Sequence, residues 1–213
     1  MNAIKLTLVI IHLSIGCALF GQQNEIIPDL TQVNNADIWA LHNRSVDPGR
    51  EIHLDGKPED GLLWIKKPIF SNGKIELDIR GKDQAGRSFV GVAFHGVDES
   101  TFDAVYFRPF NFKHPERKGH SVQYISHPGY TWFKLREEFP EKYENPVSPV
   151  PDPNDWFHAT VVVEYPMVYV YVNNSTEPSL TVEQLSSRKQ GWIGFWVGNN
   201  SEGWFKNLKI VPD

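Results

Sequence analysis

The chain has 213 residues, of which 40% are hydrophobic and 13% aromatic, and its formal net charge is −5. This length and composition predict one globular domain with a substantial core, not a disordered or fibrous chain. The mild acidity and the lack of a Lys/Arg run exclude a nucleic-acid-binding surface, because phosphate binding needs a basic stripe. Seven Trp, seven Tyr and thirteen Phe are typical of a β-sandwich core.

The N-terminus has the features of a secretory signal. Lys5 precedes an apolar run, residues 6–20, which polar residues follow at once. This run is too short for a spanning helix, so we expect a signal peptide over residues 1–21 and an exported domain, periplasmic or secreted, over residues 22–213. Cys17 leaves lipoprotein anchoring as an alternative, but Ser14 stands where such cleavage boxes prefer Leu. Because Cys17 is the single cysteine, no disulfide is expected, which favours a bacterial origin.

The first half of the domain reads as short strands. We expect strands at 39–41 and 51–54, a fully apolar strand at 62–65, and a strand at 74–80 after the turn at Asn72-Gly73. The segment 74–80 alternates apolar and charged residues, so Ile75, Leu77 and Ile79 should face the core while Glu76, Asp78 and Arg80 face solvent.

The segment 88–95 alternates as well. Val90, Val92 and Phe94 should share one face, and Gly91, Ala93 and His95 the other. Two small residues on the second face would leave space above the sheet for a ligand.

The second half continues the same pattern. Strands are expected at 105–108 and 122–125, a hairpin at 156–164 and 168–172 around Tyr165-Pro166, and two closing strands at 192–197 and 204–211. A Pro-rich loop occupies 140–155, and a single helical turn is expected at 134–139. Many short strands separated by turns predict an all-β sandwich or jelly roll.

Residues 91–144 carry the candidate site. Their strands interleave aromatic rings with Arg, Asn and Gln, and such a mixture suits a sugar: rings cover the apolar face of a pyranose, and planar polar groups bind its hydroxyls. We therefore expect substrate-binding roles for one set of residues: His95, Tyr106, Asn111, Gln123, Tyr124, Trp132 and Arg136.

Three further residues are candidates for catalysis. Cleavage of a glycosidic bond usually needs two carboxyl groups, and Asp103 and Glu144 adjoin the aromatic segments, where burial could raise a pKa into the range of a general acid. Arg108 lies in an apolar run and could steady developing negative charge, although a structural ion pair is the alternative role. The histidines match no compact metal motif, so we expect no metal and no cofactor.

Several segments together resemble a known superfamily. Asn72-Gly-Lys-Ile-Glu-Leu-Asp-Ile-Arg80, Phe89-Val-Gly-Val-Ala-Phe-His95 and Gly191-Trp-Ile-Gly-Phe-Trp-Val-Gly-Asn199 resemble concanavalin A-like lectin/glucanase domains. Within that superfamily the chain is most similar to exported bacterial 3-keto-disaccharide hydrolase-type and laminin-G-like domains. The resemblance implies a concanavalin A-like jelly-roll β-sandwich of two antiparallel sheets, with a concave face that binds carbohydrate.

The resemblance does not fix catalysis, because the superfamily contains both enzymes and lectins. The glucanase signature Glu-x-Asp-x-x-Glu begins at Glu76 and Asp78, but Gly81 stands in place of its third acid. Our hypothesis is an exported domain that hydrolyses or eliminates a glycosidic bond, with a 3-keto-sugar as a candidate substrate. The alternatives are a non-catalytic carbohydrate-binding module and, more weakly, an adhesion domain. The sequence names neither the sugar nor the oligomeric state.

Overall fold

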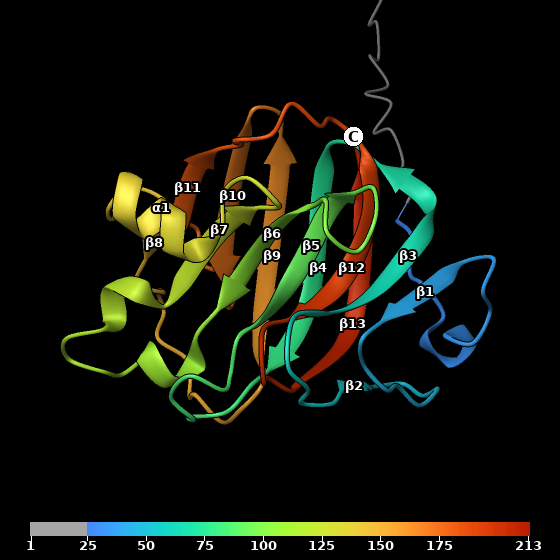
Figure 1. Cartoon of the computed structure of the whole chain (residues 1–213), viewed down its shortest axis with the longest axis horizontal. Helices are drawn as coiled ribbons and strands as arrows, with labels where there is room; N and C mark the ends of the chain where they lie inside the picture. The colour runs from blue at the N-terminus through green and yellow to red at the C-terminus, as the bar shows by residue number, and fades with distance from the viewer. Residues whose placement is uncertain (1–24) are drawn as a thin grey trace, which may run out of the picture.

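The computed structural model describes residues 25–213, which form two antiparallel sheets packed as two layers (Figure 1). The expected signal peptide and Cys17 lie outside the described residues. The first sheet has seven strands in the order β1 (Trp39–His42), β3 (Gly61–Phe70), β12 (Gly191–Val197), β5 (Val90–Gly96), β6 (Asp103–Phe107), β7 (Val122–Ser126) and β8 (Glu144–Asn145). The second has six, in the order β11 (Leu180–Glu183), β10 (Met167–Val172), β9 (Phe157–Glu164), β4 (Gly73–Arg80), β13 (Gly203–Pro212) and β2 (Ile52–Leu54). The expected all-β jelly-roll sandwich is confirmed.

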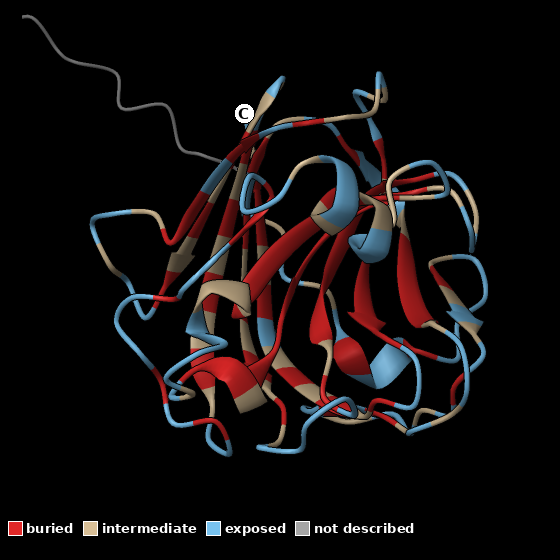
Figure 2. Cartoon of the chain, turned by 60° about the vertical axis from the view of Figure 1, so that its left-hand side comes forward, coloured by how far each residue is buried: buried red, intermediate tan, exposed pale blue. Residues whose placement is uncertain are grey.

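The core lies between the sheets and follows from strand alternation. In β4, Ile75, Leu77 and Ile79 are fully buried while the charged residues between them are partly exposed, as the sequence predicts. Ile75 pairs with Val161 of β9 in register, so the apolar face continues from strand to strand. Each such side chain contributes roughly 1.5–3 kcal/mol through burial. Figure 2 shows the result: buried residues line the strands, and exposed residues gather in the loops.

A β-bulge at the end of β5 changes the direction of one predicted site residue. Between Trp192 and Gly194 of β12 the pairing with β5 advances from Gly96 to Ala93, so β5 carries one extra residue. His95 in this bulge has φ 49° and is fully buried. Its Nε2 lies 2.7 Å from the Ser71 carbonyl oxygen, and its Nδ1 lies 3.2 Å from Nε2 of Gln184. The bulge breaks the alternation, so His95 packs in the interior and not on the ligand-facing side where we expected it.

Short helical elements lie beside the β7 and β8 edge of the seven-stranded sheet (Figure 1). Helix α1 (Trp132–Glu138) begins after Thr131, whose hydroxyl accepts a hydrogen bond from the Lys134 backbone, and Leu135 anchors the helix as its buried residue. The 3-10 turns η2 (Pro109–Asn111) and η3 (Lys118–His120) follow β6, while η1 (Leu30–Gln32) lies near the start of the described chain. None of the helices in residues 25–213 is long and apolar enough to cross a membrane.

Candidate functional site

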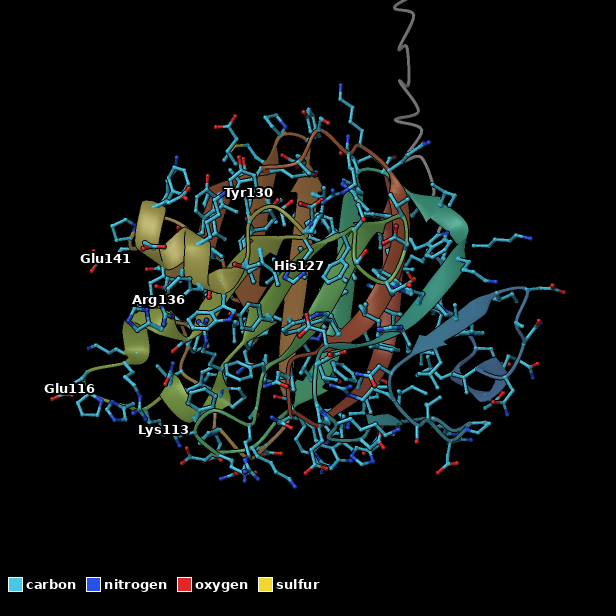
Figure 3. All side chains as sticks on the ribbon, in the orientation of Figure 1. Lys113, Glu116, His127, Tyr130, Arg136 and Glu141 are labelled. Carbon is cyan, nitrogen blue, oxygen red and sulfur yellow. The ribbon has the colours of Figure 1, made fainter. Side chains whose placement is uncertain are left out.

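A cavity of about 460 Å³ lies over the seven-stranded sheet. Tyr106 of β6 and Trp196 of β12 contribute to its floor, with ring centroids 4.9 Å apart. Trp132 and Arg136 of α1 line it from the helix side, and Figure 3 shows Arg136 below this helix. The space expected above Gly91 is occupied, because a Cβ there would meet the Tyr106 Cα at 2.6 Å. Gly91 therefore lets the Tyr106 strand approach closely and does not itself open a ligand site.

At the wall of the cavity, one buried arginine connects two adjacent strands. The Arg108 side chain follows β6, and one of its terminal nitrogens donates hydrogen bonds to the Tyr106 hydroxyl and to Oε1 of Gln123 on β7. The Tyr106 hydroxyl in turn donates to Gln123 Oε1 at 2.7 Å. All three residues are at least 96% buried, and burial raises the pKa of Tyr106 to about 12. Tyr106 thus stays a neutral phenol in contact with a fixed positive charge.

Glu144 on β8 is the counterion for this side of the cavity. Its carboxylate accepts two hydrogen bonds from Arg136, at 3.0 Å from Nε and 2.7 Å from Nη2, and lies 3.5 Å from Arg108 Nη1. His120 Nδ1 is 2.8 Å from Glu144 Oε1. Burial opposes ionisation of Glu144, but these cations outweigh burial and hold its pKa below the usual range. Glu144 is therefore a fixed carboxylate and a poor source of protons.

Asn111 and Arg117 lie on the same side of the cavity, on η2 and just before η3. The Asn111 amide nitrogen donates to the His120 carbonyl oxygen at 3.0 Å, and its Oδ1 accepts from Arg117 Nε at 3.2 Å. Asn111 is almost fully buried, whereas Arg117 is exposed. Both residues line the cavity. Asn111 thus holds the exposed guanidinium of Arg117 through its Nε.

Asp60 and His127 also line the cavity, and the sequence did not single out either as a site residue. Burial raises the pKa of Asp60, although attraction to His127 and interaction with the Trp196 indole oppose the rise. Burial lowers the pKa of His127, so its neutral form is favoured. Figure 3 shows His127 over the middle of the sheet. Asp60 comes from the Pro58-Glu-Asp-Gly61 turn before β3, where an acid has no distinctive sequence signal.

Two other predicted site residues lie on the opposite side of the same sheet, in the interior of the sandwich. Asp103 Oδ1 accepts from the Tyr124 hydroxyl at 2.6 Å. Asp103 Oδ2 accepts from Ser186 Oγ at 2.7 Å and from Arg188 Nη2 at 3.0 Å. Asp103 and Tyr124 are fully buried, and neither lines the cavity. An acid/base pair of Asp103 with Glu144 is therefore not formed, because strand alternation directs the two carboxylates to opposite faces.

The remaining predicted residues do come together. The structure brings five of them to the cavity wall and places two more directly behind it. Those on the wall are Tyr106, Arg108, Asn111, Trp132 and Arg136; those behind it are Gln123 and Glu144. Within residues 25–213 there is no group of three or more His, Cys, Asp or Glu side chains arranged to hold a metal ion.

The fold and the cavity define a concanavalin A-like jelly-roll domain, and solved structures agree. The carbohydrate-binding module CBM66 from Bacillus subtilis superposes with a TM-score of 0.59 at 16% identity, covering 81% of this chain and 94% of that one. The metal-free exoplasmic/lumenal domain of VIP36 gives 0.64 at 11% identity, covering 90% and 92%. A putative glycosyl hydrolase from Parabacteroides distasonis gives 0.51 at 14% identity, covering 83% and 89%. At such identities these likenesses concern the fold alone.

The sequence places the chain more narrowly. The family model described as the 3-keto-alpha-glucoside-1,2-lyase-like domain matches residues 31–211. The chain belongs to this family, as the sequence resemblance indicated, and is a carbohydrate-related domain of the 3-keto-disaccharide hydrolase type. A comparison with curated proteins found no match.

Proposed function

We propose that this domain cleaves the glycosidic bond of a 3-keto-glucoside by elimination, inside the cavity over the seven-stranded sheet. The observation that carries the proposal is the placement of Asp60, a carboxyl group with a raised pKa, in the same cavity as Arg108 and Arg136. A ketone at C3 of a sugar acidifies the proton at C2. A base near the operating pH and a positive field for the resulting enolate are then the main chemical requirements.

Asp60 is the proposed base. Its carboxylate takes the proton from C2, and the electron pair of the C–H bond forms an enolate on the C3 oxygen. Because its pKa is raised above the usual value for an aspartate, it is a stronger base than an exposed carboxylate. Glu144 lacks this property, because the cations around it hold its pKa below the usual range. Asp103 is excluded by position, because it faces the interior of the sandwich and does not line the cavity.

The arginines are the proposed stabilisers of the enolate. Arg108 is 4% exposed and its four terminal N–H groups already face protein acceptors, so it acts through charge more than through a direct hydrogen bond. The low dielectric of the site strengthens that charge relative to its effect in water. Arg136 adds a second positive charge, with Glu144 fixing its orientation.

Collapse of the enolate completes the elimination. A double bond forms between C1 and C2, the bond from C1 to the leaving oxygen breaks, and that oxygen takes a proton from water in the cavity. Solvent afterwards removes from Asp60 the proton that came from C2. The aromatic rings that line the cavity, including Trp132 and Trp196, would cover the sugar ring.

The test is turnover of 3-keto disaccharides, with the matching native disaccharides as reference. We expect the 3-keto substrates alone to be cleaved, with a primary isotope effect when C2 carries deuterium. Asp60→Asn should lower the rate about 10²- to 10⁴-fold, the usual contribution of a general base. Asp47→Asn, at an exposed aspartate away from the cavity, should leave the rate unchanged.

Two results would contradict this assignment in different ways. Full activity of Asp60→Asn would remove Asp60 as the base. Tight binding of disaccharides by the unaltered protein, with no turnover of any 3-keto substrate, would favour the non-catalytic binding module instead.

A further inference from the structure

The cavity contains more positive charge than the proposed elimination needs. Acids outnumber bases in the chain by 26 to 21, yet the guanidinium groups of Arg108, Arg117 and Arg136 all line this one cavity. Glu144 is the carboxylate that neutralises Arg136, and it is also the nearest one to Arg108. The net charge of the three arginines, Glu144 and Asp60 together is therefore +1 when Asp60 is ionised and +2 when it is protonated.

Arg117 is the member of the trio whose charge is uncompensated. Its Nε donates to Asn111 Oδ1, but within residues 25–213 no carboxylate lies within ion-pairing distance of its guanidinium. The neighbouring Glu116 lies at the outer edge of this loop, away from the sheet (Figure 3). An exposed arginine is often simply solvated, but this one is held by a buried asparagine, in a cavity that two other arginines also line. An anionic group on a ligand in this cavity would therefore meet a positively charged wall.

We propose that the cavity takes a sugar bearing an anionic group, a carboxylate of the uronic acid type or a sulfate, and that Arg117 binds this group. The inference deepens the proposed function and rests on it only in taking this cavity as the sugar site. The planar fork of Arg117 presents two terminal nitrogens that can bind a carboxylate or sulfate in bidentate fashion. Asn111 reduces the freedom that the side chain would lose on binding, because it already fixes Nε.

The test compares two probes that differ only at C6: methyl α-D-glucopyranoside and its uronic acid counterpart. Isothermal calorimetry on the full domain at low ionic strength should show the uronide binding at least about fivefold more tightly, as expected for a charge-assisted pair in a cleft. The preference should shrink as salt is raised, because added ions screen a partly exposed pair. In Arg117→Gln the two probes should bind almost equally.

Lys118→Gln is the matched control, because it removes one exposed positive charge next to Arg117 from a residue that does not line the cavity. It should keep the preference for the uronide. The proposal is overturned if the unaltered domain does not bind the uronide or binds both probes equally, or if Arg117→Gln retains the full preference. Turnover of neutral 3-keto disaccharides without any uronide preference refutes this inference alone. A uronide preference without turnover refutes the elimination and leaves this inference standing.

Discussion

The substitution Glu144→Gln tests whether one carboxylate holds the cationic side of the cavity together. Glutamine has nearly the same shape and keeps an acceptor oxygen, so the change removes the charge with little change in packing. In the native protein the Glu144 side chain is 2% exposed, and Arg108, Arg136 and His120 surround it. After the substitution Arg108, with a side chain 5% exposed, remains buried without an anionic partner.

The expected loss of stability follows from these exposures. Removing one partner of a buried ion pair costs about 3 kcal/mol or more, because the other charge remains desolvated. The pair with Arg136 adds little, about 0.5 kcal/mol, since that side chain is 37% exposed and solvent screens it. The retained acceptor of glutamine offsets part of the loss. We therefore expect the free energy of unfolding to fall by roughly 3 kcal/mol and Tm by about 6–12 °C.

Urea unfolding monitored by tryptophan fluorescence measures this change, with Glu116→Gln as the control at an exposed acid. The double variant Glu144→Gln with Arg108→Met separates charge from shape: it should lose less stability than the sum of the single variants, because neither charge remains alone. A loss below about 0.5 kcal/mol in Glu144→Gln, or strict additivity in the double variant, would refute the reasoning.

Three further outcomes are expected. Because the folded pKa of Glu144 lies below its ordinary value of 4.5, its contribution to stability is fully present above that pH. The contribution should disappear as the pH falls through the lowered pKa; an acid titration of unfolding in which the native protein and Glu144→Gln lose stability in parallel would contradict this. Asp103→Asn should lower the free energy of unfolding, measured in urea, by about 3 kcal/mol, while the folded variant keeps its affinity for sugar. A loss of sugar binding without a loss of stability would contradict the interior role of Asp103. Arg80→Ala should lower the free energy of unfolding by about 1 kcal/mol, because the Arg80 guanidinium lies 4.8 Å from the ring centroids of both Trp156 and Trp204. Equal stability of Arg80→Lys and the native protein would argue against stacking of the guanidinium on these rings.

Much of the fold was predictable because the strands alternate cleanly. The segment 74–80 shows this well: its apolar residues are buried and its charged residues face outward, as β4. The hairpin around Tyr165-Pro166 also formed as expected, with Met167 paired to Glu164. Two short strands, β8 and β11, were not expected; β8 has only two residues, too few to show any periodicity.

The site was predictable in part, and the reason is local geometry. Tyr106 and Gln123 are directly paired across β6 and β7, so neighbouring strands bring them to one face. The sequence also made Tyr124 a candidate, yet adjacent residues of a strand point to opposite sides, and Tyr124 faces the interior. His95 was assigned to the wrong face because an alternating pattern does not reveal a bulge. Asp60 was missed because its role arises from tertiary burial, which a turn sequence does not encode.

The contrast among three carboxyl groups supports the assignment of Asp60 most strongly. Asp103 accepts hydrogen bonds from four different side chains and is closed off in the interior, so it holds loops and strands together. Glu144 is saturated by Arg136 and sits against Arg108, so it stays ionised and orients its neighbours. For Asp60 burial prevails over the attractions, and its pKa rises. A carboxyl group that is half-buried and lines a cavity can exchange a proton with a ligand, whereas the other two carboxylates are held by the protein itself.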